Sequence, residues 1–290
     1  MEMTEMSGLD ETPAGTVCLG DLRVQRLGFG AMRVSNARNT QGERDRELAR
    51  QLVRRAVDRG VTFIDTANIY GLGQSEEIIA EALRPYPPDL VIGTKSGYEV
   101  RTLLPGEQRL PANGHPEHLK AECDGSLRRL GLDHIDLYQL HTPDPAVPYA
   151  DSVGAFLELQ RAGKIRHIGI SNVTAEELAV AQSIAPVVSV QNRYNVGDRE
   201  SEQVLLVCEA AGIAFIPWQP IARGGAVIDA AHRVATSHGA SVQQIVLAWL
   251  LRRSPAMLPI PGTSDAAHLD ANLDAAWIEL TDADFTLLAG

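Results

Sequence analysis

Short apolar runs alternate with segments of helical periodicity along most of the chain. In residues 45–59, for example, apolar positions fall three or four apart on one helix face, and Gly60 marks the end of that helix. Each apolar run ends at a polar residue, glycine or proline, which is typical of a strand. The pattern predicts a hairpin at residues 17–26 and strands at residues 27–30, 61–65, 90–95, 135–141, 165–171, 187–191, 213–217 and 257–261. It predicts helices at residues 45–59, 75–83, 116–130, 149–162, 174–183, 200–211 and 265–275, with one or two more between residues 217 and 253.

Eight strand-and-helix units in about 250 residues match a closed parallel barrel. We therefore predict an α/β fold: a single (β/α)8 barrel over residues 16–290 with an N-terminal β-hairpin, preceded by a disordered tail at residues 1–15. A doubly wound open sheet is the alternative, but it usually has a glycine-rich turn after its first strand. Here Gly28-Phe29-Gly30 lacks a third glycine and does not lead directly into a helical pattern.

The composition narrows the class of protein. Of the 290 residues 44% are hydrophobic, which allows a sizeable core, and the net charge of −11 argues against nucleic-acid and membrane-surface partners. The three cysteines are far apart, and neither they nor the eight histidines have a metal-site spacing, so we expect no metal and a reducing compartment. The N-terminus has no signal-peptide pattern, and no run of about 18 apolar residues exists. Together these features predict a cytoplasmic protein.

Ionisable residues end several of the predicted strands. Asp65, Lys95 and His141 end consecutive strands, and the C-terminal strand ends of a parallel barrel share the mouth where active sites lie. Only three of the 26 basic residues are lysines, so Lys95 at a strand end suggests a task that arginine cannot perform. Taken singly, each residue also has a structural explanation: Asp65 could cap a turn, Tyr70 could pack in a loop, and Lys95 could extend its ammonium to water. His141 could equally hydrogen-bond a neighbouring loop.

Together, Asp65, Tyr70, Lys95 and His141 suit acid catalysis. A phenol has an unperturbed pKa of about 10, and a nearby ammonium ion is expected to lower it toward the working range. A carboxylate would hold the ammonium ion, and an imidazole would orient the carbonyl oxygen that receives the proton. Such a proton transfer needs a hydride donor at the carbonyl carbon, which is the chemistry of a nicotinamide cofactor.

These residues lie in long segments that resemble the aldo-keto reductase family. The resemblance runs from about Leu22 to Leu280 and is carried by residues 60–67 with Tyr70-Gly71, by Thr94-Lys95, and by residues 130–141 and 163–172. The family's catalytic Asp, Tyr, Lys and His match Asp65, Tyr70, Lys95 and His141. The resemblance implies a TIM barrel that binds NADPH without a Rossmann domain.

The resemblance also implies a set of cofactor contacts. It matches Ser171, Asn172 and Gln191 to residues that hold the nicotinamide amide, and Phe215 to the aromatic residue that stacks on the nicotinamide. Trp218 would shape the wall of the cofactor or substrate site. The full expected set is Gly30, Ala31, Met32, Ser171, Asn172, Gln191, Phe215, Trp218, Gly262, Thr263, His268 and Asn272.

The last of these loops departs from the family pattern. Gly262 stands where many members carry a lysine, His268 where an arginine commonly grips the 2′-phosphate, and Ala271 where a glutamate often meets the adenine. Backbone N–H groups at a helix N-terminus can still bind phosphate. NADPH is therefore the expected cofactor, with NADH as the alternative.

The leading hypothesis is an NADPH-dependent carbonyl reductase that turns an aldehyde or ketone into an alcohol, with Tyr70 as general acid. Two alternatives are a nicotinamide-binding regulatory or sensor subunit with little turnover, and an aldolase that forms a Schiff base on Lys95. Loops at residues 96–114 and 142–148 are long enough to wall a substrate pocket, and the short C-terminus predicts an open one. A monomer is the expected state, with a homo-oligomer as the alternative.

Overall fold

The structure is a computed structural model that describes residues 13–39, 41–220 and 226–289, with the backbone alone for residues 226–228. Most of the tail expected at residues 1–15 lies outside the described residues. Its last two residues are fixed, because the Arg26 backbone N–H donates to the Gly15 carbonyl at 3.1 Å and the Arg26 side chain donates to the Ala14 carbonyl at 3.0 Å.

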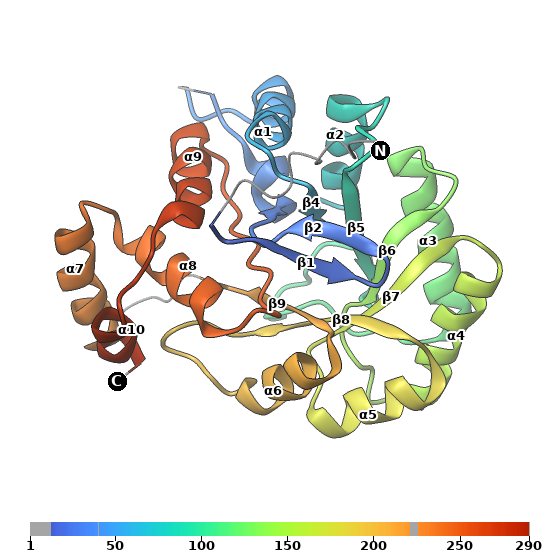
Figure 1. The fold of residues 1–290 in the computed structure, drawn as a ribbon. Coiled ribbons are helices and arrows are strands. Elements are labelled where there is room, and N and C mark those ends of the chain that lie inside the picture. The colour runs from blue at the N-terminus through green and yellow to red at the C-terminus, as the bar shows by residue number, and fades with distance from the viewer. Residues whose placement is uncertain (1–12, 40, 221–225, 290) are drawn as a thin grey trace, which may run out of the picture.

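Seven parallel strands pair in chain order and form a curled sheet (Figure 1). Each strand pairs with the next in the sequence, as expected when a helix connects every pair of parallel strands. The strands are β3 (Phe29–Gly30), β4 (Phe63–Asp65), β5 (Val91–Ser96), β6 (Ile135–Leu140), β7 (Ile165–Ser171), β8 (Val187–Arg193) and β9 (Ala214–Trp218).

The predicted eighth strand, residues 257–261, is present as an irregular segment that closes the barrel. Leu258 N–H donates to the Phe215 carbonyl at 2.8 Å, which joins the segment to β9. On its other side the segment accepts from Gly28 at 3.0 Å, which joins it to the residues before β3. A regular strand does not form because Pro259 and Pro261 have no N–H to donate. The (β/α)8 barrel is therefore confirmed, with a correction to its last strand.

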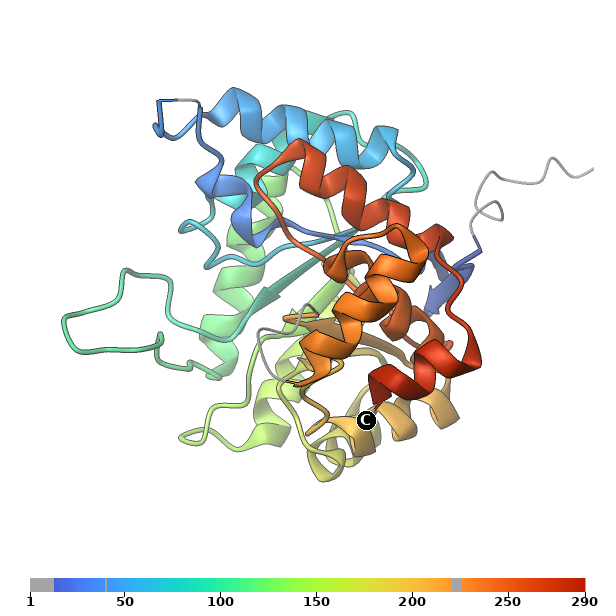
Figure 2. The same cartoon turned by 90° about the vertical axis from the view of Figure 1, so that its left-hand side faces the viewer.

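The helices surround the sheet on its outer side (Figures 1 and 2). They are α1 (Arg46–Asp58), α2 (Gln74–Leu83), α3 (Pro116–Leu130), α4 (Tyr149–Arg161), α5 (Ala175–Ile184), α6 (Glu202–Ala211), α7 (Ala226–His238), α8 (Val242–Arg253), α9 (Ala266–Asp274) and α10 (Asp282–Ala289), with 3-10 turns η2 (Ala31–Asn36) and η3 (Ala275–Trp277). The predicted helical region before Arg253 thus contains two helices. The sequence pattern did not predict η2, which follows β3 directly, or α10.

The expected hairpin consists of β1 (Thr16–Leu19) and β2 (Leu22–Gln25), paired antiparallel. Leu19 and Val24 are fully buried and pack with apolar side chains of the barrel interior, including Phe63. At the turn, Asp21 accepts from Arg166 and contacts His167, both at 2.6 Å, which fixes the hairpin to β7. The hairpin covers the end of the barrel where the strands begin, so the opposite end is left for a site.

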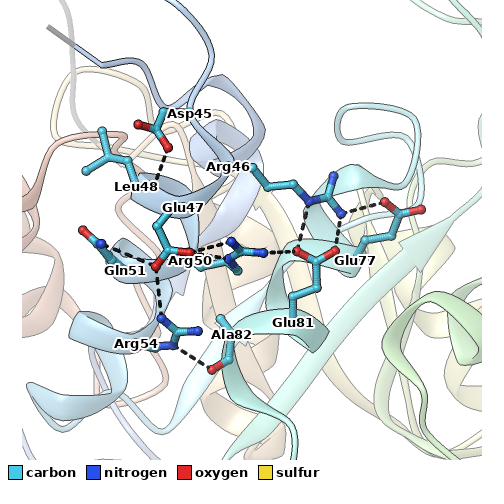
Figure 3. A network of polar contacts seen from close by, with 10 residues as sticks. All are labelled: Asp45, Arg46, Glu47, Leu48, Arg50, Gln51, Arg54, Glu77, Glu81 and Ala82. Carbon is cyan, nitrogen blue, oxygen red and sulfur yellow. Dashed lines mark hydrogen bonds and ion pairs between the residues drawn. The ribbon is translucent and has the colours of Figure 1, made fainter.

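Exposed arginines join neighbouring helices of the outer layer. Arg46 of α1 contacts Glu77 at 3.0 Å and Glu81 at 2.6 Å on α2, and Arg50 contacts Glu81 at 3.0 Å. Figure 3 shows how these side chains link the two helices. Each exposed pair is worth only about 0–1 kcal/mol. These exposed pairs differ from the ion pair of Lys95, whose side chain is fully buried.

Candidate active site

A buried ion pair lies at the C-terminal ends of β4 and β5. Lys95 Nζ is 2.7 Å from Asp65 Oδ2, and it also donates to the Thr66 carbonyl at 2.8 Å. Lys95 is fully buried and Asp65 is 2% exposed. Two charges this deep are stable only when paired and hydrogen-bonded, so each requires the other.

The pair keeps Lys95 charged. Burial disfavours its ammonium form, but the charge of Asp65, with a smaller effect from Tyr70, outweighs burial and raises the pKa of Lys95. A Schiff-base nucleophile needs a neutral amine and therefore a lowered pKa. The direction of this shift argues against the aldolase alternative.

Tyr70 lies in the loop after β4, beside the ion pair. Lys95 Nζ is 5.2 Å from the centroid of the Tyr70 ring, and the rings of Tyr70 and His141 are 6.1 Å apart and nearly perpendicular. Burial raises the pKa of Tyr70 and Lys95 opposes this effect, with the net shift upward. The expected lowering of this pKa is wrong for the structure, because desolvation outweighs the ammonium charge. The phenol therefore stays protonated at neutral pH and has a proton to give.

His141 follows β6 directly and is neutral. Burial, with the charge of Lys95, holds the pKa of His141 well below its usual range. Its buried Nδ1 has no hydrogen-bond partner in the part of the chain that the structure describes. Tyr98, from the loop after β5, packs edge-on against the imidazole at 4.9 Å. A neutral imidazole in this position can donate one hydrogen bond to a carbonyl oxygen.

The second oxygen of Asp65 accepts from two glutamines. Gln191 Nε2 donates to Oδ1 at 2.9 Å and Gln139 Nε2 at 3.1 Å. Gln191 was expected near the cofactor, whereas Gln139 and Tyr98 were missed by sequence reasoning. Gln139 could have been found from the sequence, because a polar amide within the otherwise largely apolar strand β6 suggests a specific contact.

Four of the expected cofactor residues form one network beside these groups. Ser171 Oγ donates to the Gln191 carbonyl at 2.6 Å, Asn172 Nδ2 donates to the His141 carbonyl at 2.8 Å, and Trp218 Nε1 donates to Asn172 Oδ1 at 2.9 Å. Asn172 has a φ of 58°, a left-handed conformation that asparagine tolerates better than most residues. The network joins β7, β8 and β9 to the loop that carries His141.

Phe215 does not reach the mouth of the barrel. Along β9, Ala214 and Ile216 belong to the interior cluster, so Phe215 between them points outward to the helix layer. It is fully buried and packs edge-on against Tyr194 at 5.7 Å. The expectation that Phe215 stacks on the nicotinamide is therefore wrong. Trp218, half-buried at the end of the strand, is the aromatic residue at the mouth.

The first and last strands meet at two glycines. A Cβ on Gly262 would lie 2.7 Å from the Gly30 carbonyl oxygen, and one on Gly30 would lie 2.6 Å from the Ile260 carbonyl oxygen. A lysine at position 262, common in the family, would clash here. In the adjoining η2, Ala31 is buried and its carbonyl accepts from Ser75, while Met32 is 53% exposed.

The last residues of the expected cofactor set, Thr263, His268 and Asn272, lie in α9 or just before it. Asp265 caps this helix by accepting from the His268 N–H at 2.9 Å, and Thr263 Oγ1 accepts from the Asp265 N–H at 3.0 Å. The side chain of His268 is 77% exposed, and Asn272 is buried. Between Gly262 and Asn272 the sequence has no lysine or arginine.

Two loops follow the strands that lead to Lys95 and His141 at the mouth of the barrel. The loop between β5 and α3 extends from the body, at the left of Figure 2, and is braced by Arg101 and Glu107 at 2.7 Å. Its Leu103 and Leu104 are about half exposed. Asp144 of the second loop accepts from the Gly114 N–H at 2.9 Å, so the two loops are joined.

Metal-binding clusters and membrane-spanning helices are both absent from the described residues. Among the described residues, no group of three or more His, Cys, Asp or Glu side chains could hold a metal ion. No helix in the described ranges combines the length and the apolar character needed to cross a membrane.

Comparison with known proteins gives consistent matches over almost the whole chain. The model of the Aldo/keto reductase family matches residues 26–290. An uncharacterized oxidoreductase of Schizosaccharomyces pombe is 44% identical over 287 residues, which cover 97% of this chain and 91% of that protein. Pyridoxine 4-dehydrogenase of Escherichia coli is 40% identical over 288 residues, covering 96% and 98%. A solved aldo/keto reductase of Klebsiella pneumoniae, in complex with NADP and acetate, has a TM-score of 0.78 at 27% identity and covers 94% of this chain and 93% of its own.

Proposed function

The chain belongs to the aldo/keto reductase family and is an NAD(P)H-dependent oxidoreductase, and we propose that it reduces an aldehyde or ketone to an alcohol with NADPH. The observation that supports this most is the contact between a buried Asp65–Lys95 ion pair and Tyr70 at the mouth of the barrel. The solved relative that holds NADP supports the choice of cofactor.

The residues at the mouth fit a nicotinamide cofactor. Trp218 offers a half-buried aromatic face, and the hydroxyl of Ser171 and the amide of Asn172 lie within hydrogen-bonding distance of one another beside it. We assign the carboxamide of the nicotinamide to Ser171, Asn172 and Gln191, and its ring to Trp218. The rest of the cofactor would lie along Gly30, Ala31, Met32, Gly262, Thr263, His268 and Asn272.

The protein's part in the reaction is a proton transfer. When bound, NADPH supplies a hydride to the carbonyl carbon. Tyr70 donates its phenolic proton to the carbonyl oxygen, so the product is an alcohol and the enzyme retains a phenolate. The Lys95 ammonium stabilises that phenolate, and Asp65 holds Lys95 in place. The neutral His141 donates a hydrogen bond that orients the carbonyl oxygen.

The decisive variant is Tyr70→Phe, which removes the proton donor and keeps the ring. We expect kcat to fall by about 10²- to 10⁴-fold, the usual contribution of a general acid, while the Kd of NADPH stays the same. Tyr149→Phe is the matched control, because its hydroxyl has no partner among the described residues. Wild-type rates in Tyr70→Phe on several carbonyl substrates would refute the role of Tyr70.

The substrate panel tests the alternatives at the same time. NADPH and NADH are compared against aliphatic and aromatic aldehydes and ketones. The relative that is 40% identical is named pyridoxine 4-dehydrogenase, so we place pyridoxal with NADPH first in the panel, and pyridoxine with NADP+ for the reverse direction. No turnover with either cofactor would favour the sensor alternative, and borohydride trapping of substrate on Lys95 would favour the aldolase.

A further inference from the structure

Gln139 is a fully buried glutamine whose side chain makes a single hydrogen bond among the described residues. It lies on β6, its Nε2 donates to Asp65 Oδ1 at 3.1 Å, and no other side-chain partner occurs among the described residues. Its Oε1 is also buried and unpaired there. Burying an amide with one of its four possible hydrogen bonds made is unfavourable, and an apolar side chain of the same size would cost less. The contact with Asp65 is the benefit that this residue provides.

The contacts of Asp65 are divided between its two oxygens. Oδ1 accepts from Gln139 and Gln191, whereas Oδ2 accepts from Lys95. Two amides on one oxygen fix the plane of the carboxylate and turn the other oxygen toward the ammonium ion. Gln191 also lies in the expected cofactor set, so Gln139 is the residue that acts on the ion pair alone.

The neighbouring strands leave room for Gln139. In the sheet register, Gln139 lies between Lys95 of β5 and Gly169 of β7. A Cβ on Gly169 would lie 2.7 Å from Gln139 Cγ and 2.3 Å from Ser189 Oγ. Only glycine at this position allows the glutamine side chain to pass inside the barrel toward Asp65.

We propose that Gln139 is a positioning residue, which holds Asp65 in the orientation that keeps Lys95 protonated. The inference rests on the proposed function, because the ammonium ion is needed to stabilise the Tyr70 phenolate. Lys95 faces other titratable groups too, namely Asp65 on β4, Tyr70 after β4 and His141 after β6. Of these, Asp65 alone is a carboxylate side chain and accepts a hydrogen bond from Lys95 Nζ, at 2.7 Å, so its orientation decides how firmly Lys95 is held.

The test is Gln139→Met, with the exposed Gln51→Met as the matched control. We expect kcat to fall by about 10- to 100-fold, as a misplaced catalytic group does. The alkaline limb of the pH–kcat profile should move down by about one pH unit, because Lys95 loses its proton sooner. The Kd of NADPH should stay the same, and the thermal unfolding midpoint should not fall. Gln139→Leu provides the same measurements if the methionine variant does not fold.

A readout without turnover separates this proposal from the proposed function. If Lys95 is held less firmly as an ammonium ion, its folded-state pKa in Gln139→Met lies about one unit below the raised wild-type value. The stability of Gln139→Met relative to wild type should then rise with pH above about pH 9.5, measured by urea unfolding. This holds even if no carbonyl substrate is turned over, a result that would refute only the proposed function. Unchanged pH profiles of rate and of stability would overturn the positioning role. A lower unfolding midpoint with an unshifted rate profile would also overturn it, since that is a purely structural effect.

Discussion

Asp65→Asn tests the electrostatic reasoning most directly, because it removes the charge that stabilises Lys95 and keeps the shape of the side chain. Asparagine can still accept hydrogen bonds from Gln139 and Gln191 through Oδ1. Its Nδ2 group then faces Lys95 as a donor, where Asp65 Oδ2 accepted at 2.7 Å. A donor facing an ammonium ion disfavours the charge, and burial disfavours it further. The pKa of Lys95 should therefore fall below its ordinary value of 10.5.

The size of the effect follows from the burial of the pair. Removing one partner of a buried ion pair costs about 3–5 kcal/mol. In the wild type the folded-state pKa of Lys95 is raised, so its contribution is full below pH 10.5 and is lost as pH rises through the folded value. In Asp65→Asn the folded-state pKa lies below the unfolded one, so the unfolded chain binds more protons and stability rises with pH. The slope of the difference approaches about 1.4 kcal/mol per pH unit.

The assay is urea unfolding of both proteins at several pH values between about 8 and 10. The quantity compared is the difference in unfolding free energy, which removes the titration of groups common to both. Asp65→Asn should be the less stable protein at about pH 8 and should recover by up to about 2.7 kcal/mol by pH 10. A difference that does not change with pH would refute the reasoning. As a control, Asp65→Asn combined with Lys95→Met has no buried charge and should show no such slope.

Three further predictions concern packing and a second buried pair. Phe215→Ala should lower the unfolding free energy by about 3–5 kcal/mol and leave the Kd of NADPH unchanged. Trp218→Ala should instead weaken NADPH binding in a fluorescence titration. Equal Kd values for the two variants would contradict this prediction. Gly262→Ala should cost about 1–3 kcal/mol in thermal unfolding, because its Cβ would lie 2.7 Å from a backbone carbonyl oxygen, and an unchanged midpoint would show that the strands can separate. Arg129→Met should cost about 3–5 kcal/mol because it leaves the fully buried Glu76 without its 2.6 Å partner; adding Glu76→Gln should restore most of the loss.

Much of the fold could be predicted from local patterns. The helix expected at residues 116–130 has those bounds in the structure, and the helix expected at residues 174–183 is α5, capped at Thr174 by a capping box with Glu177. Such features depend on residues three or four apart, which the sequence lists directly. The last strand was harder, because residues 257–261 extend like a strand but their two prolines cannot complete a ladder.

For the site, too, some features could be predicted from the sequence and others could not. The sequence by itself determined which chemistry-bearing residues end the strands: Asp65, Lys95 and His141, with Tyr70 in the next loop. Their order along parallel strands is enough to bring them to one mouth. The face of β9 on which Phe215 lies could not be determined this way, because a shift of one position reverses inside and outside and only pairing with β8 fixes it.

Only the tertiary structure decided how these groups behave. Lys95 lies next to Tyr70 as expected, yet the pKa of the phenol rises, because the amount of water removed by the folded chain outweighs one neighbouring charge. Gln139 reaches Asp65 because Gly169, 30 positions further along the chain, leaves the space empty. Charge and residue type are written in the sequence, whereas solvent exclusion and the meeting of distant side chains arise only when the barrel closes.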